Sequence, residues 1–388
     1  MSGLEPDKPI EASCDPMQAS PTPPASGFNT RAIDLGRIEC LQILDENGDI
    51  EEGLHPDIED KELLRVHRAM LLSRAFDSRM LAMQRQGQMG TFAPNLGQEA
   101  CMIGQVWPLG ADDWFSPSYR AFGAQIWRGW SMERLMTLWA GYHDGFPPPD
   151  DVKDLPFSIV IGSHVLPATG IAMAMRRAKD PHCMVVNFGD GAFSQGAITE
   201  AMNFAAVDKA PVVFVCENNG WAISTPLEKQ AGNEVLAARG AGYGVHSIRV
   251  DGNDILAMMT AMKEACDRAR RGEGPTLIEA ITFRMSLHTT ADDPTVYRDE
   301  SLVEPWHNRC PIRRFELWLT RTDRLTTQDC DRIRAECEQE VLDAREHFRK
   351  NATAKPREIF DHIYETITPE LEAQRMAYLR RLDRKGVE

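Results

Sequence analysis

Two buried-strand patterns close together constrain the fold of this chain more than any other feature. Cys183–Phe188 is an almost continuous apolar run of strand length that ends at Gly189-Asp190-Gly191. A second such run, Pro211–Cys216, ends at Glu217-Asn218-Asn219. Between them, Gln195 to Val207 carries apolar side chains at helical spacing. This order predicts two parallel neighbouring strands joined by a right-handed crossover helix.

The same alternation of strand and helix patterns continues from about residue 155 to residue 285. It predicts an α/β fold with a mostly parallel sheet and helices on both faces. A long helix is expected from about Asp60 to Gln86, with Gly87 as its stop signal. We expect this domain to occupy residues 36–310. A disordered arm, rich in proline and serine, is predicted at 1–35, and a charged helical extension at 311–388.

Polar side chains stand where the two central strands end. Asp190 and Asn219 would lie just beyond the carboxyl ends of adjacent strands, where open α/β sheets bind ligands. Neighbouring strands are about 4.8 Å apart, and oxygen ligands about 2.1 Å from an ion such as Mg²⁺ fit this spacing. Gly189 and Gly191 allow backbone N–H groups to approach a phosphate. The pattern predicts a site for a metal-bound diphosphate, although each motif alone is an ordinary turn sequence, and Asn218 could be only a turn residue.

Charge and cysteine usage limit the partners and the compartment. The net charge of −15 argues against nucleic acid and anionic membranes as partners, and no apolar run approaches the length of a membrane span. The nine cysteines form no CxxC pair, which favours a reducing compartment. The N-terminal residues resemble neither a secretory signal nor an Arg-rich transit peptide, so a cytoplasmic location is expected, and a mitochondrial matrix only for a eukaryotic protein.

The spacing between Gly189-Asp190-Gly191 and Asn218-Asn219 resembles the thiamine-diphosphate signature of thiamine-dependent enzymes. The wider sequence resembles one branch closely: the α subunit of the decarboxylating component of 2-oxo acid dehydrogenase complexes. The resemblance covers roughly residues 60 to 300. It rests on seven stretches: Met83–Gly87, Leu96–Ala100, Ser118–Arg120, Asn219–Thr225, Val250–Asp254, Gly274–Glu279 and Arg284–Pro294.

This resemblance implies thiamine diphosphate and Mg²⁺ as cofactors. The metal ligands would be Asp190, Asn219 and the backbone carbonyl of Trp221. His288 would be the catalytic residue, facing the cofactor, binding phosphate and handling protons near neutral pH. Its loop would be braced by Arg284 and Asp292. The implied cofactor-binding residues are Tyr119, Arg120, Ile159, Ile161, Gly189, Asp190, Gly191, Ala192, Asn219, Trp221 and His288.

The resemblance implies different roles for the members of this set. Tyr119 and Arg120 would hold the diphosphate, because a planar guanidinium binds phosphate through two hydrogen bonds. Ile159 and Ile161 would contact the aminopyrimidine ring through their backbone, whereas their side chains indicate only core positions. Thr91 and Phe92 are expected to face the substrate.

The chain has too little length left for a second, pyrimidine-binding domain once the α/β domain is assigned. The glutamate that activates the cofactor is therefore expected on a β subunit, with the cofactor at the α–β interface of an α₂β₂ assembly. A lipoyl-bearing acyltransferase core would accept the acyl group. On this interpretation the isolated chain is inactive.

The substrate is expected to be a branched-chain 2-oxo acid such as 2-oxoisovalerate, as in enzymes of the 3-methyl-2-oxobutanoate dehydrogenase type. Phe76–Met80, Trp221–Thr225 and His288–Pro294 resemble that subfamily most, whereas Ala93–Ala100 also resembles pyruvate-specific relatives. Pyruvate and then acetoin are the alternatives. A non-catalytic scaffold is a further one, against which the intact site residues argue. Thr289 occupies a position that is phosphorylated in mitochondrial relatives.

Overall fold

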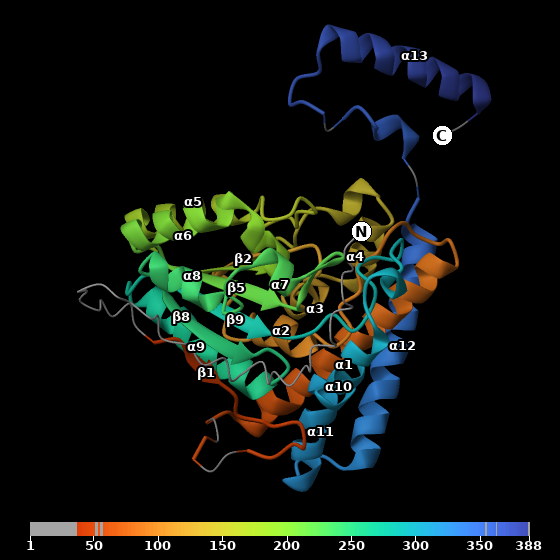
Figure 1. The fold of residues 1–388 in the computed structure, drawn as a ribbon. Helices are drawn as coiled ribbons and strands as arrows, with labels where there is room; N and C mark the ends of the chain where they lie inside the picture. Colours follow the sequence, from red (N-terminus) through yellow and green to blue (C-terminus); the bar gives the residue numbers. More distant parts are fainter. Residues whose placement is uncertain (1–36, 51–52, 55–56, 354, 362, 387–388) are drawn as a thin grey trace, which may run out of the picture.

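A seven-stranded parallel sheet forms the centre of the molecule (Figure 1). The computed structural model describes residues 37–386 except 51, 52, 55, 56, 354 and 362, so the arm expected at 1–35 lies outside the described residues. The sheet order is β1-β8-β9-β5-β4-β2-β3, and a separate antiparallel pair, β6-β7, follows β5 in the chain. The strands are β1 (Glu39–Leu41), β2 (Trp114–Ser116), β3 (Lys153–Asp154), β4 (Met184–Gly189), β5 (Val212–Asn218), β6 (Trp221–Ala222), β7 (Thr225–Pro226), β8 (His246–Asp251) and β9 (Thr276–Ile281).

Helices cover both faces of the sheet, which confirms the expected fold class. β4 and β5 are parallel neighbours, as their sequence pattern predicts. The helices are α1 (Asp60–Arg85), α2 (Glu99–Gly104), α3 (Phe122–Trp127), α4 (Met132–Trp139), α5 (Val165–Ala178), α6 (Gly196–Asp208), α7 (Leu227–Gln230), α8 (Ala237–Gly242), α9 (Ile255–Arg270), α10 (Glu304–Asn308), α11 (Pro311–Arg321), α12 (Thr327–Asn351) and α13 (Pro369–Lys385).

The central strand β5 shows why the sheet needs two helical layers. All seven of its residues are buried. Val213 and Val215 point into one hydrophobic cluster, which includes α1, α2 and α9, whereas Phe214 and Cys216 point into the other, which includes α5 and α6. Successive side chains of a strand alternate between faces. The apolar run from 212 to 216 therefore requires an apolar layer on each side of the sheet.

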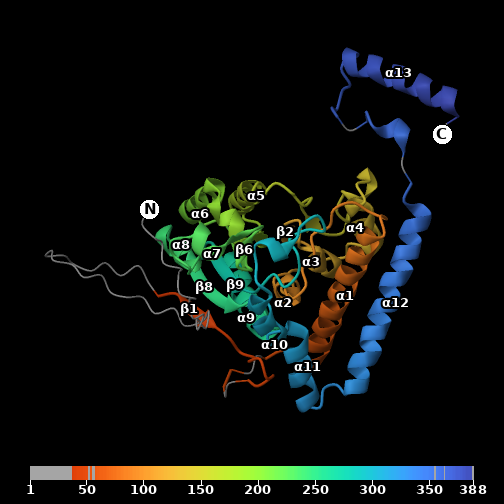
Figure 2. The same cartoon turned by 45° about the vertical axis from the view of Figure 1, so that its right-hand side comes forward.

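The C-terminal helices differ in how they join this core. Phe315 of α11, together with Val341 and Phe348 of α12, belongs to the same hydrophobic cluster as α1. In both ribbon views, α12 lies along α1, whereas α13 lies away from the sheet and its covering helices (Figures 1 and 2). The boundary expected near residue 310 stays a prediction.

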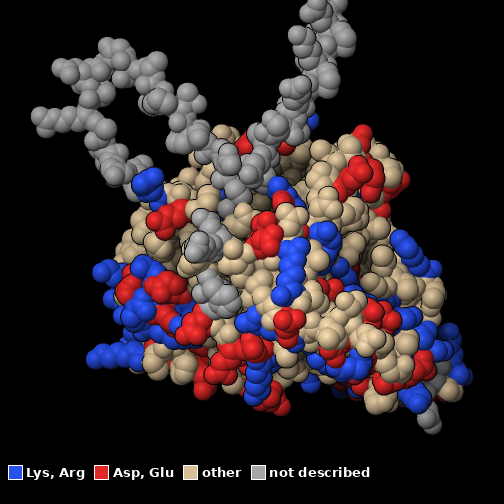
Figure 3. Space-filling model, turned by 90° about the horizontal axis from the view of Figure 1, so that it is seen from below, with Lys and Arg blue, Asp and Glu red and all other residues tan. Residues whose placement is uncertain are grey.

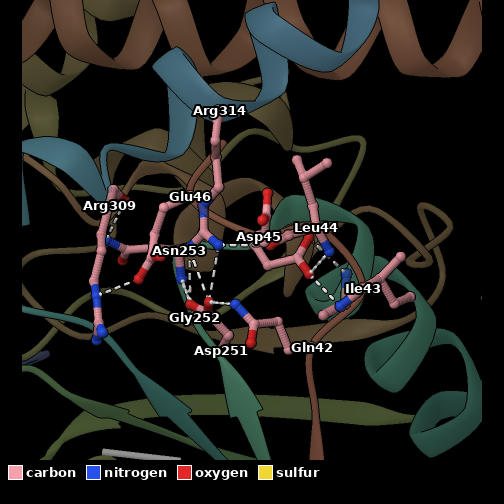
Figure 4. Close-up of polar contacts among 12 residues, drawn as sticks. Gln42, Ile43, Leu44, Asp45, Glu46, Asp251, Gly252, Asn253, Arg309 and Arg314 are labelled. Carbon is pink, nitrogen blue, oxygen red and sulfur yellow. Dashed lines mark hydrogen bonds and ion pairs between the residues drawn. The ribbon is translucent and has the colours of Figure 1, made fainter. Parts of the chain in front are cut away.

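A buried ion pair attaches α11 to the carboxyl end of β8 (Figure 4). Arg314 donates two hydrogen bonds of 2.9 Å to the two carboxylate oxygens of Asp251 and one of 2.8 Å to the carbonyl of Leu44. Beside it, Asp254 accepts hydrogen bonds of 2.6 Å from the backbone N–H groups of Ile43 and Leu44. This clasp (Arg314, Asp251, Leu44 and Asp254) therefore ties the segment after β1 to α11 and to the start of α9.

Charged side chains of both signs are interspersed on the face seen in Figure 3. The net charge of −15 is therefore not gathered into one acidic field on that face. None of the helices in the described part of the chain combines the length and apolar character that a bilayer crossing requires.

Candidate active site

The loops that follow β2, β4, β5 and β9 converge on one cavity of about 240 Å³ at the carboxyl edge of the sheet. It lies beside β2 and β4. The connection from β2 leads to β3 on one side of the sheet, whereas the connection from β4 leads to β5 on the other. Open α/β sheets place their ligands at such a switch point between strands. The structure thus brings together most of the residues expected from sequence. Those that line the cavity are Tyr119, Arg120, Ile161, Gly189, Asp190, Gly191, Ala192, Asn219, Trp221 and His288.

Asp190 follows β4 directly and is only 2% exposed. Its Oδ2 accepts a hydrogen bond of 3.1 Å from Gln230 Nε2, and burial raises the pKa of its carboxyl group to about 6. Among the described residues, no lysine, arginine or histidine forms an ion pair with this carboxylate. A buried carboxylate without a cationic partner fits a divalent cation, which would supply the missing positive charge.

Asn219 stands beyond the end of the neighbouring strand β5. Its Nδ2 donates to Gln98 Oε1 at 3.1 Å, and its Oδ1 accepts from the backbone N–H of Trp221 at 3.3 Å. The carbonyl of Trp221, the third expected metal ligand, accepts a hydrogen bond of 3.4 Å from Arg284. These are oxygen donors of the kind that Mg²⁺ prefers.

Asn218 behaves as a turn residue. Its Nδ2 donates to Glu279 at 2.8 Å and its Oδ1 accepts from the N–H of Gly220 at 3.3 Å. It does not line the cavity. Of the two interpretations left open by the sequence, the structure favours the structural one.

Two arginines bring an excess of positive charge to the cavity: Arg120 lines it, and Arg284 contacts His288, which lines it too. Arg120 donates to the carbonyls of Pro94 and His288, and Arg284 donates to the carbonyl of Ile223 at 2.6 Å. Neither guanidinium forms an ion pair with a carboxylate in the described part of the chain. Burial and the neighbouring guanidinium of Arg120 lower the pKa of Arg284 to about 10. An anion such as a diphosphate would offset both charges, so this cluster fits the group that the resemblance implies.

His288 lies between these arginines, with the Tyr119 ring edge-on to it at 6.3 Å between ring centroids. The guanidinium groups of Arg120 and Arg284 each lie 3.2 Å from its Nδ1. Both can only donate, so Nδ1 accepts and the proton of the neutral ring is on Nε2. Burial, Arg120 and Arg284 lower the pKa of His288 to about 4. The ring is therefore neutral near pH 7 in this structure, and its role in handling protons stays a prediction.

The loop around His288 is braced as the sequence predicts. Asp292 Oδ2 accepts hydrogen bonds from the N–H of His288 at 2.8 Å and from the hydroxyl of Tyr297 at 2.6 Å. Arg284 also donates to that hydroxyl at 2.9 Å. The loop after β9 is therefore fixed to the loop after β5 through Arg284.

Four expected residues differ from the rest in their placement. The side chains of Ile159 and Ile161 are 65% and 40% exposed, so their interpretation as core residues is wrong; Ile161 lines the cavity, whereas Ile159 does not. They precede α5 in a loop, where a short apolar run has no layer to bury it. Thr91 is exposed and Phe92 is fully buried against Phe122 and Trp139; neither lines the cavity. Their role towards substrate stays a prediction.

Sequence reasoning missed polar residues in the wall of the cavity and behind it. Glu217 is buried in β5, and its Oε1 accepts hydrogen bonds from Asn187 and Gln105 at 2.8 and 2.9 Å. Burial raises the pKa of Glu217 to about 7. An acidic residue at the end of an otherwise apolar strand was a signal for it. Gln230, which contacts Asp190, carried no such signal because it lies far along the chain.

The fold and the site together define an α/β protein that presents oxygen donors and a cluster of two arginines and a histidine at the carboxyl edge of a parallel sheet. The sequence profile described as "Dehydrogenase E1 component" matches residues 67–357. The chain belongs to this family, which confirms the resemblance drawn from its motifs.

Individual relatives carry two different names. The chain is 41% identical to the "Pyruvate dehydrogenase E1 component subunit alpha" of Acholeplasma laidlawii, over 85% of this chain and 96% of the relative. It is 38% identical to the "3-methyl-2-oxobutanoate dehydrogenase subunit alpha" of Mycobacterium tuberculosis (strain CDC 1551 / Oshkosh), over 89% and 94%. A Bacillus subtilis (strain 168) relative, again named as a pyruvate dehydrogenase α subunit, is 35% identical over 88% and 92%.

Proposed function

We propose that this chain is the α subunit of a thiamine-diphosphate-dependent 2-oxo acid dehydrogenase. In this role it would bind Mg²⁺ and the diphosphate of the cofactor, and its product would be an acyl group passed to a lipoyl arm on an acyltransferase core. The observation that carries the proposal is the opposed pair of charges in one cavity. Asp190, a buried carboxylate without a cationic partner among the described residues, lines the same space as Arg120. Arg284 contacts His288, which also lines the cavity, and neither arginine has a carboxylate partner in the described part of the chain.

Each group of residues has a defined task in this proposal. Asp190, Asn219 and the carbonyl of Trp221 would hold Mg²⁺, while Arg120 and Tyr119 would hold the diphosphate. His288 would donate the hydrogen bond of its Nε2–H to a phosphate oxygen, because its Nδ1 is already occupied as an acceptor. Bound thiamine diphosphate would supply the electron sink for loss of CO₂ from the 2-oxo acid.

A β subunit is part of the proposal because a catalytic site of this kind needs a carboxylate for the pyrimidine ring. Glu217 lines the cavity, but its Oε1 is engaged by Asn187 and Gln105. The exposed side chains of Ile159, Val160 and Ile223 stand at or beside the cavity and would be covered by the partner. We therefore expect decarboxylation of the 2-oxo acid only in the α₂β₂ assembly.

Two substrates are candidates because the relatives carry both names. Branched-chain 2-oxo acids are favoured by the motifs at Phe76–Met80 and His288–Pro294, and pyruvate by the motif at Ala93–Ala100. A comparison of kcat/KM for 2-oxoisovalerate and pyruvate, on the chain co-expressed with its β subunit, decides between them. A large preference for either substrate names the enzyme, and turnover of neither contradicts the proposed reaction.

The site assignment is tested separately by Asp190→Ala. This variant should lose Mg²⁺-dependent binding of thiamine diphosphate, because it removes a metal ligand. It should keep its thermal unfolding midpoint, because alanine adds no bulk and removes a carboxylate whose burial is unfavourable. Binding is followed by tryptophan fluorescence in the assembled protein. Full decarboxylation activity in Asp190→Ala would exclude the assigned metal site.

A further inference from the structure

The loop Pro94–Gln98, which precedes α2, lies directly behind the candidate site. Gln98 is fully buried, and its Oε1 accepts a hydrogen bond of 3.1 Å from Nδ2 of Asn219, 121 residues further along the chain. At the other end of the loop, the carbonyl of Pro94 accepts a hydrogen bond from Arg120. One short loop therefore contacts a proposed metal ligand and a proposed phosphate ligand.

The contact with Gln98 decides which end of the Asn219 carboxamide is free. The oxygen and nitrogen of a carboxamide have nearly the same shape, but only the oxygen can bind a hard cation. The backbone N–H of Trp221 can only donate and Gln98 Oε1 can only accept, so the two contacts together place Nδ2 of Asn219 on the side of Gln98. Oδ1 is then left for the backbone N–H of Trp221 and for the cavity that Asn219 lines.

The loop itself is held rigidly by helix α1. Asp77 Oδ1 accepts the backbone N–H of Asn95 at 2.9 Å. Arg74 binds the two carboxylate oxygens of Glu99 at 2.8 Å each, and Glu99 Oε1 accepts the N–H of Gly97 at 3.3 Å. The position of the Gln98 oxygen is therefore set by contacts on both sides of it.

The other end of the Gln98 side chain shows that packing does not explain it. Its Nε2 is buried and has no hydrogen-bond partner among the described residues. An unpaired buried N–H is unfavourable, so an apolar side chain of similar length would suit this position better if it only filled space. What the carboxamide adds is the contact of its oxygen with Asn219.

We propose that Gln98 is a positioning residue for the divalent cation: it holds the carboxamide of Asn219 with Oδ1 turned to the metal. The inference rests on the proposed function, since it takes Asn219 as a metal ligand. Gln98 acts through Asn219 and does not itself touch the ion.

The test compares Gln98→Met with Gln98→Glu in the full chain assembled with its β subunit. Mn²⁺ replaces Mg²⁺, and its binding in the presence of thiamine diphosphate is followed by the loss of the free-ion electron paramagnetic resonance signal. Gln98→Met removes the acceptor and should weaken Mn²⁺ binding by about 10- to 100-fold, as expected for an outer partner of a metal ligand. Gln98→Glu keeps an acceptor oxygen in either protonation state and should restore most of the affinity.

A matched control is Gln125→Met on α3. Gln125 is also buried, at 2% exposure, and its Nε2 likewise lacks a partner among the described residues, but it does not contact Asn219. This variant should bind Mn²⁺ as the unmodified protein does. Equal weakening by Gln125→Met and Gln98→Met would assign a merely structural role and overturn the inference, as would unchanged Mn²⁺ affinity in Gln98→Met.

The variant Asn219→Ala separates this inference from the proposed function. If Asn219→Ala weakens Mn²⁺ binding but Gln98→Met does not, only the positioning role is wrong. If Asn219→Ala binds Mn²⁺ with full affinity, the metal site itself is misassigned and the inference falls with it.

Discussion

Gly191 forms part of the cavity wall, and its neighbour leaves no room for a side chain. A Cβ atom added there would lie 2.7 Å from Cβ of Ala222, a distance that forces one of the two loops to shift. Gly191→Ala should therefore impair binding of thiamine diphosphate to the assembled protein by at least about tenfold, the effect of a small misplacement at a site of this kind. Fluorescence titration with the cofactor measures the loss.

Gly196, five residues later at the start of α6, is the natural control. A Cβ atom there would meet nothing within 4 Å. Gly196→Ala should keep cofactor affinity and leave stability the same or higher by up to about 1 kcal/mol, because alanine has the better helix propensity. Equal loss of binding in both variants would mean that the close approach to Ala222 is not what matters.

Asp77 should make the stability of the protein depend on pH. Burial raises the pKa of this carboxyl group to about 7, whereas the unfolded chain has the ordinary value near 4. The folded protein then holds a proton that the unfolded chain has lost, so the stability from this group is present below pH 4 and falls as pH rises towards 7. Asp77→Asn removes this dependence and keeps an acceptor for the N–H of Asn95.

Between pH 5 and pH 7 the unmodified protein should lose on the order of 2 kcal/mol relative to Asp77→Asn. Thermal unfolding midpoints of the two proteins at several pH values measure this difference. Asp150→Asn, a change at an exposed position, should run parallel to the unmodified protein. Parallel curves for Asp77→Asn would show that Asp77 is ionised throughout.

At the scale of elements, the clasp between α11 and β8 is the contact with the clearest expected cost. Arg314→Met would leave Asp251 partly buried without its counterion and the carbonyl of Leu44 without its donor. Removal of one partner from a buried pair typically costs about 3 kcal/mol or more. The free energy of unfolding, from urea titration, should fall by this amount.

Helix α11 also offers a control of the opposite kind. Arg321 pairs with Asp49 at 2.7 Å, but their side chains are 49% and 67% exposed. Arg321→Met should change stability by less than about 1 kcal/mol, because exposed pairs are screened by solvent. Similar losses in the two variants would show that burial of the Arg314 pair adds nothing.

Elements whose signals are local could be predicted from sequence. The helix expected from Asp60 to Gln86 is α1 at Asp60–Arg85, and the two central strands are parallel neighbours as expected. An ambiguous pattern led to a wrong prediction of burial. Ile159–Ile161 is apolar like a buried strand, but it lies in an exposed loop. Apolar character predicts burial only when another element is present to cover it.

The residues of the candidate site also fall into two groups, those that a local sequence pattern predicts and those that it does not. Asp190 and Asn219 could be predicted because each follows a recognisable strand. The partners Gln98 and Gln230 could not, since they contact these residues across 121 and 40 positions of sequence and lie in segments without a distinguishing pattern. The tautomer of His288 depends on two arginines from different loops, which no local pattern encodes.

For the whole molecule, the C-terminal segment after α12 should contribute little to the stability of the chain. Among the described residues from 355 to 386, Leu382 is the one that is buried, and none belongs to the main hydrophobic cluster or packs against it. A chain ending at Thr353 should therefore unfold within about 2 °C of the full chain, a shift that corresponds to about 1.5 kcal/mol or less for a chain of this size. Calorimetry of both chains measures the midpoint.

A chain ending at Arg324 is the contrasting truncation. It also removes α12, and with it Cys337, Val341 and Phe348 from the main cluster. Cys330, which is also buried, is lost with them, and loss of these four side chains should lower the midpoint severely or prevent folding. If the chain ending at Thr353 is destabilised as much as the chain ending at Arg324, the segment after α12 takes part in the core in a way that burial does not reveal.

The full burial of β5 has a consequence for how such a protein can change over generations. Because a polar substitution at any position from 212 to 216 would meet an apolar layer, this part of the strand has almost no freedom to drift. The loop that begins at Asn219 has more, since part of it is exposed at Ile223. New substrate preferences are therefore expected to arise through replacements in loops of this kind, while the sheet beneath them is inherited almost unaltered.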